Sequence, residues 1–377
     1  MDLICFCHLR WNFVYQRPQH LMSRFTTENR VFFFEEPIYD TSSPHYTLTA
    51  DETSKTLVVT PHLPEGIDII AAQRELLDQL IGAENITPGI AWYYSPMSLA
   101  FSNHLTPDII VYDCMDELSA FRFAPPALKQ YESMLFNKAD IVFTGGYHLY
   151  EAKQYLHDNI HPFPSSIDKA HFEQARKALP EPVDQVNIPH PRIGFYGVVD
   201  ERFNISLLKE VALLHPEWHF VIVGPVVKID PATLPVADNI HYIGGRSYKD
   251  LPSYLSGWDV AMMPFALNES TKYISPTKTP EFLAGAKPVV STSIRDVVIP
   301  YGRDGLVEIA DTVNEFSEAI GLLLHAKDNN EWLQKVDTFL ADISWDKTYQ
   351  QMLDLINSAI ERKKNNNNKQ NKQEAYV

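Results

Sequence analysis

The stretch Tyr273–Ser291, YISPTKTPEFLAGAKPVVS, combines a polar turn, a short helix and a buried strand in direct succession. The turn at residues 275–278 contains two hydroxyl side chains, a proline and a lysine, a composition typical of a helix start. The spacing of apolar residues predicts a helix over 279–286, with Gly285 near its end. The apolar run at 287–291 predicts a strand after a tight turn. We expect the rest of the chain to be organised around this stretch.

The start of this short helix is a candidate binding site for an anion. Free N–H groups in a first helical turn attract negative charge, and Ser275, Thr277 and Lys278 add further donors. Glu281 lies in the same turn, where its carboxylate could accept hydrogen bonds from two hydroxyls of a ribose ring. A glutamate at this position can also simply complement the helix dipole. Together these residues favour a nucleoside-diphosphate site.

The composition predicts a soluble, acidic protein. The chain has 377 residues, 45% of them hydrophobic, enough for two ordinary α/β domains with real cores. With 32 basic and 48 acidic residues the formal charge is −16, which argues against nucleic acid as the main partner and against broad adhesion to anionic lipid. The three cysteines lack a zinc-site spacing, and no apolar run suits a signal peptide or a membrane span. We therefore expect a cytoplasmic location.

The first half of the chain predicts a doubly wound parallel sheet. A strand at 3–7, a polar aromatic loop, a helix from 18 to 26 and a strand at 30–34 form a β-loop-α-β unit. Further strands are predicted at 57–60, 90–94, 109–112 and 141–144, with helices between them at 69–81, 97–105 and 126–138.

Polar side chains gather after three of these strands, where ligands bind to parallel sheets. The three groups are His8, Arg10, Arg17, Gln19 and His20; Glu35 and Glu36; and Asp113, Asp116 and Glu117. Each group also has an ordinary structural explanation, because His20 could face solvent, Asp116 could cap a helix, and paired carboxylates are often solvated. Three groups on one rim nevertheless indicate a site. We single out Asp116, His8 and His20 as its candidate residues.

A proline-rich span between residues 159 and 192 predicts a connection between two domains. A second β-loop-α-β unit then begins with a strand at 193–196, Gly197 directly after it, and a loop that contains Arg202. The fingerprint G-x-G-x-x-G is absent, which disfavours a nicotinamide enzyme. A glycine with an arginine nearby suits a phosphate that reaches across a cleft from the 275–278 turn. The alternative is that Gly197 only permits the turn and that Arg202 is a surface charge.

Two Rossmann-like halves facing a cleft, with an anion site in the second, resemble the GT-B architecture of nucleotide-sugar glycosyltransferases. The stretch SPTKTPEFLAGAKPVVST resembles the donor-site signature of family 4 glycosyltransferases, in which the Glu of E-x-(L/M)-A-x-G-x-P-V-V holds the ribose. The stretches FCHLRWNFVYQRPQHLMSRF and VFFFEEP resemble the N-terminus of a bacterial subgroup involved in teichuronic-acid, exopolysaccharide and cell-surface polysaccharide synthesis. The resemblance extends to about Ala359.

This resemblance implies that a sugar is transferred with retention from a nucleoside-diphosphate sugar, by family analogy a UDP-sugar, to a growing glycan or lipid-linked acceptor. It implies no bound metal and no other cofactor. A lipid-linked acceptor would bring the protein to the inner membrane face. The implied site consists of Glu281 for the ribose; Ser275, Thr277 and Gly197 for the diphosphate; Arg202 and Lys278 for the leaving-group charge; and Asp116, His8 and His20 on the acceptor side.

The same architecture gives the expected domains. These are an acceptor domain at 1–183 completed by a helix at 345–363, a donor domain at 184–344, and a polar tail at 364–377 that we expect to be disordered.

Two features depart from the family 4 pattern. Tyr273 stands where the family has another Glu, eight positions before the ribose Glu, and the usual A-A-G-K is A-G-A-K at 284–287. The lost Glu favours one alternative, a non-catalytic GT-B scaffold in a polysaccharide assembly complex. Another alternative is a nucleotide-sugar epimerase or hydrolase on the same fold, which would need no acceptor pocket. No motif encodes the donor base, the sugar or the acceptor.

Overall fold

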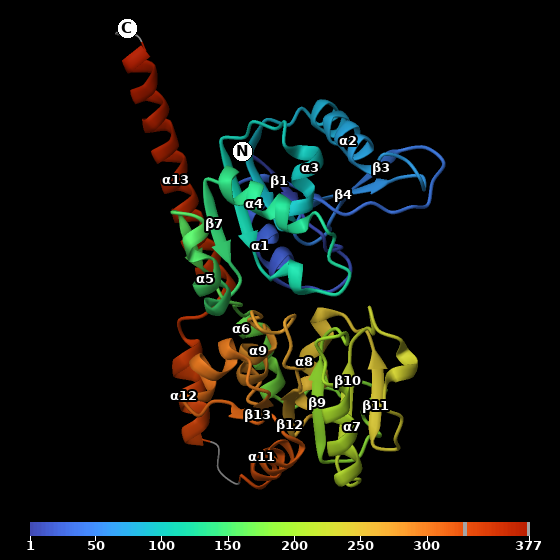
Figure 1. The fold of residues 1–377 in the computed structure, drawn as a ribbon. Coiled ribbons are helices and arrows are strands. Elements are labelled where there is room, and N and C mark those ends of the chain that lie inside the picture. Colours follow the sequence, from blue (N-terminus) through green and yellow to red (C-terminus); the bar gives the residue numbers. More distant parts are fainter. Residues whose placement is uncertain (327–329, 375–377) are drawn as a thin grey trace.

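The computed structural model describes residues 1–326 and 330–374, and for 367–374 the backbone only. It consists of two α/β units, one above the other in Figure 1, each built on its own sheet. The predicted fold class, two Rossmann-like doubly wound domains, is confirmed.

The N-terminal unit is built on an eight-stranded sheet with the order β3-β4-β2-β1-β5-β6-β7-β8. All of its neighbouring strands are parallel except β3 and β4, which are antiparallel. The sequence patterns did not predict β3, an edge strand with mostly exposed residues, or β8, which has three residues and ends in proline. The strands are β1 (Asp2–Phe6), β2 (Arg30–Phe34), β3 (His45–Ala50), β4 (Leu57–His62), β5 (Pro88–Tyr93), β6 (Ile109–Cys114), β7 (Ile141–Thr144) and β8 (Ile160–Pro162).

Helices cover both faces of this sheet because the side chains of each strand alternate between the faces. In β1, Leu3 and Cys5 pack with α1 and α13, whereas Ile4 and Phe6 pack with α2, α3 and α4. The helices of this unit are α1 (Arg17–Phe25), α2 (Ile69–Ala83), α3 (Leu99–Ser102), α4 (Leu128–Lys138), α5 (Tyr147–Lys153) and the returning α13 (Trp345–Glu374).

The C-terminal unit is built on a six-stranded parallel sheet with the order β11-β10-β9-β12-β13-β14. Its strands are β9 (Arg192–Tyr196), β10 (His219–Val223), β11 (Ile240–Gly244), β12 (Val260–Met263), β13 (Val289–Ser291) and β14 (Glu308–Ile309). Its helices are α6 (Lys169–Phe172), α7 (Ile205–Leu214), α8 (Leu251–Ser256), α9 (Lys278–Ala284), α10 (Arg295–Val297), α11 (Val313–His325) and α12 (Asn330–Leu340).

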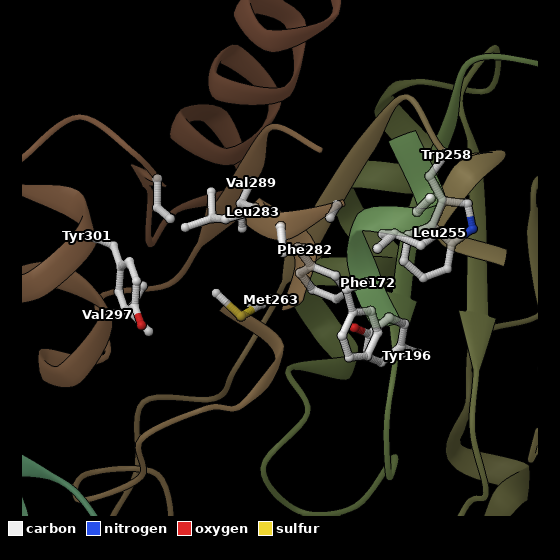
Figure 2. Close-up of a cluster of buried hydrophobic side chains, with 14 of the residues drawn as sticks. Phe172, Tyr196, Leu255, Trp258, Met263, Phe282, Leu283, Val289, Val297 and Tyr301 are labelled. Carbon is white, nitrogen blue, oxygen red and sulfur yellow. The ribbon is translucent and has the colours of Figure 1, made fainter. Parts of the chain in front are cut away.

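The proline-rich connection packs into the C-terminal core. Phe172 of α6 contacts Tyr196 and the helix residue Phe282, in the cluster that Figure 2 shows. Ile167 and Ile188 belong to the same cluster. The expected domain boundary at residue 183 assigns most of this span to the first unit, whereas its contacts are with the second. In the sequence, the apolar residues of this span are scattered among prolines and form no helix or strand pattern. They become buried only where they pack in the C-terminal core.

Helix α13 leads the chain back to the first unit, where Trp345, Met352 and Ile356 pack into the core beside α1. The helix continues to Glu374, so the expected disorder from residue 364 is wrong for residues 364–374. This segment contains lysine, glutamine and glutamate, which favour helices, and no glycine or proline to end one. Residues 375–377 lie outside the described part. No helix in the described part is long and apolar enough to cross a membrane.

Candidate functional site

The backbone turns sharply where β9 and β10 end side by side. Gly197 and Gly224 have φ angles of +133° and +152°, which side chains rarely allow. A Cβ on Gly224 would stand 1.9 Å from the carbonyl oxygen of Gly197, so the two backbones are in contact. The N–H of Gly197 donates to Val223 at 2.8 Å and is therefore already used. Gly197 provides space at this point rather than a free hydrogen-bond donor.

Lys278 fills the space above Gly197. A Cβ at Gly197 would stand 2.2 Å from Lys278 Cε, and the ammonium nitrogen lies 5.6 Å from the ring centre of Phe195. Burial lowers the pKa of Lys278, Arg202 lowers it further, and Glu281 opposes the change. Among the residues described, Lys278 forms no ion pair with a carboxylate. It is a desolvated cation whose charge a bound anion would stabilise.

Arg202 is held in a fixed direction by Asp200, a buried carboxylate. The guanidinium Nε and Nη2 donate to Asp200 Oδ1 and Oδ2 at 3.0 and 2.7 Å, a forked arrangement. The ring of Phe121, which comes from the N-terminal unit, lies 5.4 Å from the guanidinium carbon. Lys228 contacts the same ring at 5.2 Å. No sequence motif had indicated Phe121 or Lys228, because their contacts join segments about a hundred residues apart.

Glu281 follows Lys278 by one helical turn and is 6% exposed. The hydroxyl of Tyr196, at the end of β9, donates to Glu281 Oε2 at 2.8 Å. Burial raises the pKa of Glu281, while Tyr196 and Lys278 oppose the change. Sequence reasoning missed Tyr196, which is recognisable only once β9 and α9 are side by side. Tyr273, at the position of the lost family Glu, packs against His148 with ring centres 4.8 Å apart.

A cavity of about 100 Å³ lies between the two units and brings most of the predicted donor residues together. Gly197 and Glu281 do not line the cavity, but both lie next to Lys278, which does line it. The wall is formed by Gln16, Arg17, Met115, Asp116, Gly145 and Ser165 of the N-terminal side and by Phe195, Val198, Arg202, Phe203, Phe265, Ile274, Ser275, Pro276, Thr277 and Lys278 of the C-terminal unit.

Asp116 is the one predicted acceptor-side residue that lines this cavity. Burial raises its pKa to about 6, although Arg202 and Arg17 oppose the change. A carboxyl group with that pKa can take up or release a proton near neutral pH, which suits acid–base chemistry.

The two predicted histidines lie elsewhere. His8 follows β1, and its buried Nδ1 has no hydrogen-bond partner among the described residues. Burial and then Lys228 lower the pKa of His8 to about 4. His20 is 3% exposed on α1, and its ring stacks on Trp345 with centres 4.6 Å apart. His20 also contacts Tyr248, so that it packs α1 against α13 and Tyr248. A role of His20 in acceptor binding stays a prediction.

Four other residues of the predicted rim clusters form two ion pairs with one another. Arg17 forms a fork with the fully buried Asp113, with Nη2 to Oδ1 at 2.8 Å, and donates to the carbonyl of Phe163. Arg10 pairs with Glu35 at 3.2 Å. These ion pairs tie α1 and the loop after β1 to the sheet. The ordinary structural explanation therefore suffices for them, although Arg17 also lines the cavity.

The comparisons with known proteins show what the C-terminal unit is similar to. Residues 190–326 match the family described as "Glycosyl transferases group 1". A Bacillus subtilis protein described as a proposed teichuronic acid biosynthesis glycosyltransferase, TuaH, is 26% identical in an alignment of 236 residues that covers 58% of this chain. The aligned part spans 59% of that relative, less than two thirds of its length.

Solved structures with a similar fold cover nearly the whole chain. A sucrose-phosphate synthase from Thermosynechococcus elongatus superposes with a TM-score of 0.70 at 13% identity, covering 96% of this chain and 99% of that one. The catalytic domain of starch synthase IV from Arabidopsis thaliana superposes with a TM-score of 0.66 at 10% identity, covering 96% and 99%. At such identities the likeness concerns the fold alone. The residues that match the family model form the C-terminal half of a GT-B fold.

Proposed function

We propose that this chain is a glycosyltransferase. It transfers a sugar, with retention and without a metal ion, from a nucleoside-diphosphate sugar, most simply a UDP-sugar, to a growing cell-surface glycan or a lipid-linked acceptor. The reaction takes place in the cytoplasm, and a lipid-linked acceptor brings the protein to the inner face of the membrane.

The observation that carries this proposal is the convergence of Arg202, Lys278 and Glu281 beside one cavity between the units. Two cations in low-polarity surroundings match a diphosphate, whose leaving-group charge they stabilise as the glycosidic bond breaks. Ser275 and Thr277 add hydroxyl donors at the same wall. The buried carboxylate of Glu281, beyond Lys278, is the partner for ribose hydroxyls.

The acceptor side of the proposal rests on Asp116, which lines the same cavity as the cations and whose pKa burial raises to about 6. We propose that it orients or deprotonates the acceptor hydroxyl, and that His8 and His20 contribute to acceptor binding outside the cavity wall. The cavity holds about 100 Å³, whereas small-molecule sites typically measure about 300–1,000 Å³. The units therefore open to admit the donor and close around it, which excludes water from the sugar.

Three comparisons support the proposal. The described relative is a proposed teichuronic acid biosynthesis glycosyltransferase, and one similar solved structure carries ADP and acarbose. Another, from E. coli, carries UDP-2-fluoro glucose and superposes with a TM-score of 0.68 at 11% identity.

Thermal unfolding in the presence of UDP, GDP, ADP and their glucose conjugates tests the donor site. One nucleotide at about 100 times its Kd should stabilise the wild type by about 2.7 kcal/mol. The stabilisation should disappear in Glu281→Ala and persist in Glu308→Gln, which changes an exposed carboxylate of the same unit. Circular dichroism verifies that both variants are folded. No stabilisation of the wild type by any nucleotide would contradict the proposal.

Product analysis separates the proposal from its alternatives. Transfer to an added glycan marks a transferase. A changed or hydrolysed sugar without an acceptor marks an epimerase or hydrolase. A scaffold would give neither product, whether or not it binds the nucleotide.

A further inference from the structure

A second and larger cleft lies where the chain crosses between the two units. The chain leaves the N-terminal sheet at Pro162 and enters the C-terminal core at Ile167, and it returns between Leu340 and Trp345. Both crossings line one cleft of about 770 Å³, which we call the hinge cleft. Figure 1 shows this side of the molecule, where α5, α12 and the start of α13 meet.

The hinge cleft is separated from the donor cavity by a pair of serines. Ser165 Oγ donates to the carbonyl of Ser275, and the Ser165 N–H donates to Ser275 Oγ at 3.3 Å. Both serines line both cavities. The hinge cleft itself contains none of Arg202, Lys278 and Glu281, so its ligand is a separate question from the donor.

Aromatic and hydroxyl side chains both line the hinge cleft. Tyr301 and Phe339 lie against each other with ring centres 5.0 Å apart, and Tyr147 is half exposed at the rim. Thr348 and Gln351 of α13 add polar groups to the lining of the cleft. Flat apolar surfaces next to groups that both donate and accept hydrogen bonds match the faces and the hydroxyls of a sugar ring.

The charges of the hinge cleft disfavour an anionic ligand. Three aspartates, Asp296, Asp342 and Asp354, line it against a single lysine, Lys347, which Asp342 already neutralises at 2.6 Å. Carboxylates repel phosphates and uronic acids but accept hydrogen bonds from neutral hydroxyls.

One buried polar group in the cleft lacks a partner. Ser166 is 2% exposed, and its Oγ has no hydrogen-bond partner within the described residues. Buried hydroxyls are normally hydrogen-bonded, and leaving one unsatisfied is unfavourable. A ligand hydroxyl in the hinge cleft would satisfy Ser166.

From these contacts we propose that the hinge cleft is a carbohydrate-binding site that takes a segment of a neutral oligosaccharide. The site uses the aromatic pair for the sugar faces, and Ser166, Asp354 and Gln351 for the hydroxyls. It is independent of the donor site, although a ligand there touches both units and both crossings.

Ligand-observed NMR and calorimetric titration with maltotetraose, cellotetraose and chitotetraose test the proposal, with tetragalacturonate as the anionic counterpart. We expect saturable binding of at least one neutral tetrasaccharide and none of the anionic one. Gln351→Trp, at an exposed cleft position of α13, should abolish this binding. Asn357→Trp, exposed on the same helix outside the cleft, should leave it intact. Ser166→Ala should weaken it roughly 3- to 10-fold.

Failure to bind any of the three neutral tetrasaccharides overturns the proposal, and so does binding that Gln351→Trp leaves unchanged. A nucleotide titration of the same Gln351→Trp protein distinguishes an effect on the hinge cleft from an effect on the donor site. Lost sugar binding with intact nucleotide binding is expected. If the wild-type protein binds the sugar but no nucleotide, the result would support the hinge site and contradict the proposed donor site.

Discussion

At the scale of single residues, the donor cavity depends on a lysine that has lost most of its hydration. Lys278 lies across Gly197 between aromatic rings, and burial is the main cause of its lowered pKa. Arg202 beside it stays charged at every physiological pH because it is a guanidinium paired with Asp200. The two cations of the site therefore differ in their response to pH.

Nucleotide affinity should fall as the pH rises from about 7 to about 9. A lysine is charged below its pKa, and a lowered pKa means that this charge is lost at a lower pH than usual, whereas an ordinary lysine stays more than about nine-tenths protonated at pH 9. We expect a loss of roughly 3- to 10-fold in the affinity for the stabilising nucleotide, measured by calorimetry. Lys278→Arg should bind with a nearly flat pH profile. A wild-type profile equally flat over this range would show that the charge of Lys278 does not contribute.

At the scale of elements, the end of α9 explains an unusual order of residues. Gly285 follows the helix with φ −72°, while Ala286 has φ +57°, the left-handed conformation that glycine normally takes. A Cβ on Gly285 would stand 2.4 Å from the buried Leu255 Cδ2. Close packing therefore requires the glycine at 285, and Ala286, where the family has glycine, adopts the strained conformation.

Ala286→Gly should stabilise the protein by roughly 0.5–1 kcal/mol, because the left-handed conformation of a residue with a Cβ is unfavourable by about 1–2 kcal/mol. Gly285→Ala should destabilise it by roughly 1–3 kcal/mol through overpacking against Leu255. Scanning calorimetry of both variants measures the shifts in Tm, which should have opposite signs. Equal signs would contradict this account of the helix end.

At the scale of the whole molecule, the two units are joined by side-chain contacts beside the hinge cleft, as well as by the two segments of chain that cross between them. The buried carboxylate of Asp296, in the C-terminal unit, accepts hydrogen bonds from the backbone N–H groups of Tyr147 and His148 at 2.8 and 3.0 Å. Arg295 pairs with Glu151 across the same interface, but with much more exposure to solvent. A buried carboxylate that accepts two N–H donors is the stronger contact of the two.

Asp296→Asn should shift the units towards an open arrangement. Hydrogen bonds to a charged group contribute about 1.5–3 kcal/mol each, so the closed population should fall about tenfold or more relative to the open one. Spin labels on Glu65→Cys and Val236→Cys, exposed positions of the two units, report the change as longer distances in pulsed EPR. The three native cysteines are buried and do not interfere.

The matched control is Glu151→Ala, which removes the exposed pair and should change the distance distribution little. An unchanged distribution in Asp296→Asn would show that Asp296 does not hold the units together.

The sequence alone was enough to predict the features that depend on local patterns. Runs of apolar residues marked most strands of the N-terminal sheet to within a few residues, because a buried parallel strand needs little more than a short apolar run between turns. The turn at 275–278 and the helix after it bring Ser275, Thr277, Lys278 and Glu281 together because these residues are close in the chain. Their grouping therefore needed no knowledge of the fold.

Only the tertiary structure decided the contacts between distant segments. Three such contacts depend on how the two sheets lie. They are the hydrogen bond from Tyr196 to Glu281, the contact of Phe121 with Arg202, and the packing of Ile167 in the C-terminal core. The pairing of Arg17 with Asp113 likewise converted predicted site residues into structural ones, because burial requires an opposite charge for each. Side-chain identity determines which partners are acceptable, whereas burial and distance, which the fold creates, determine which partner is present.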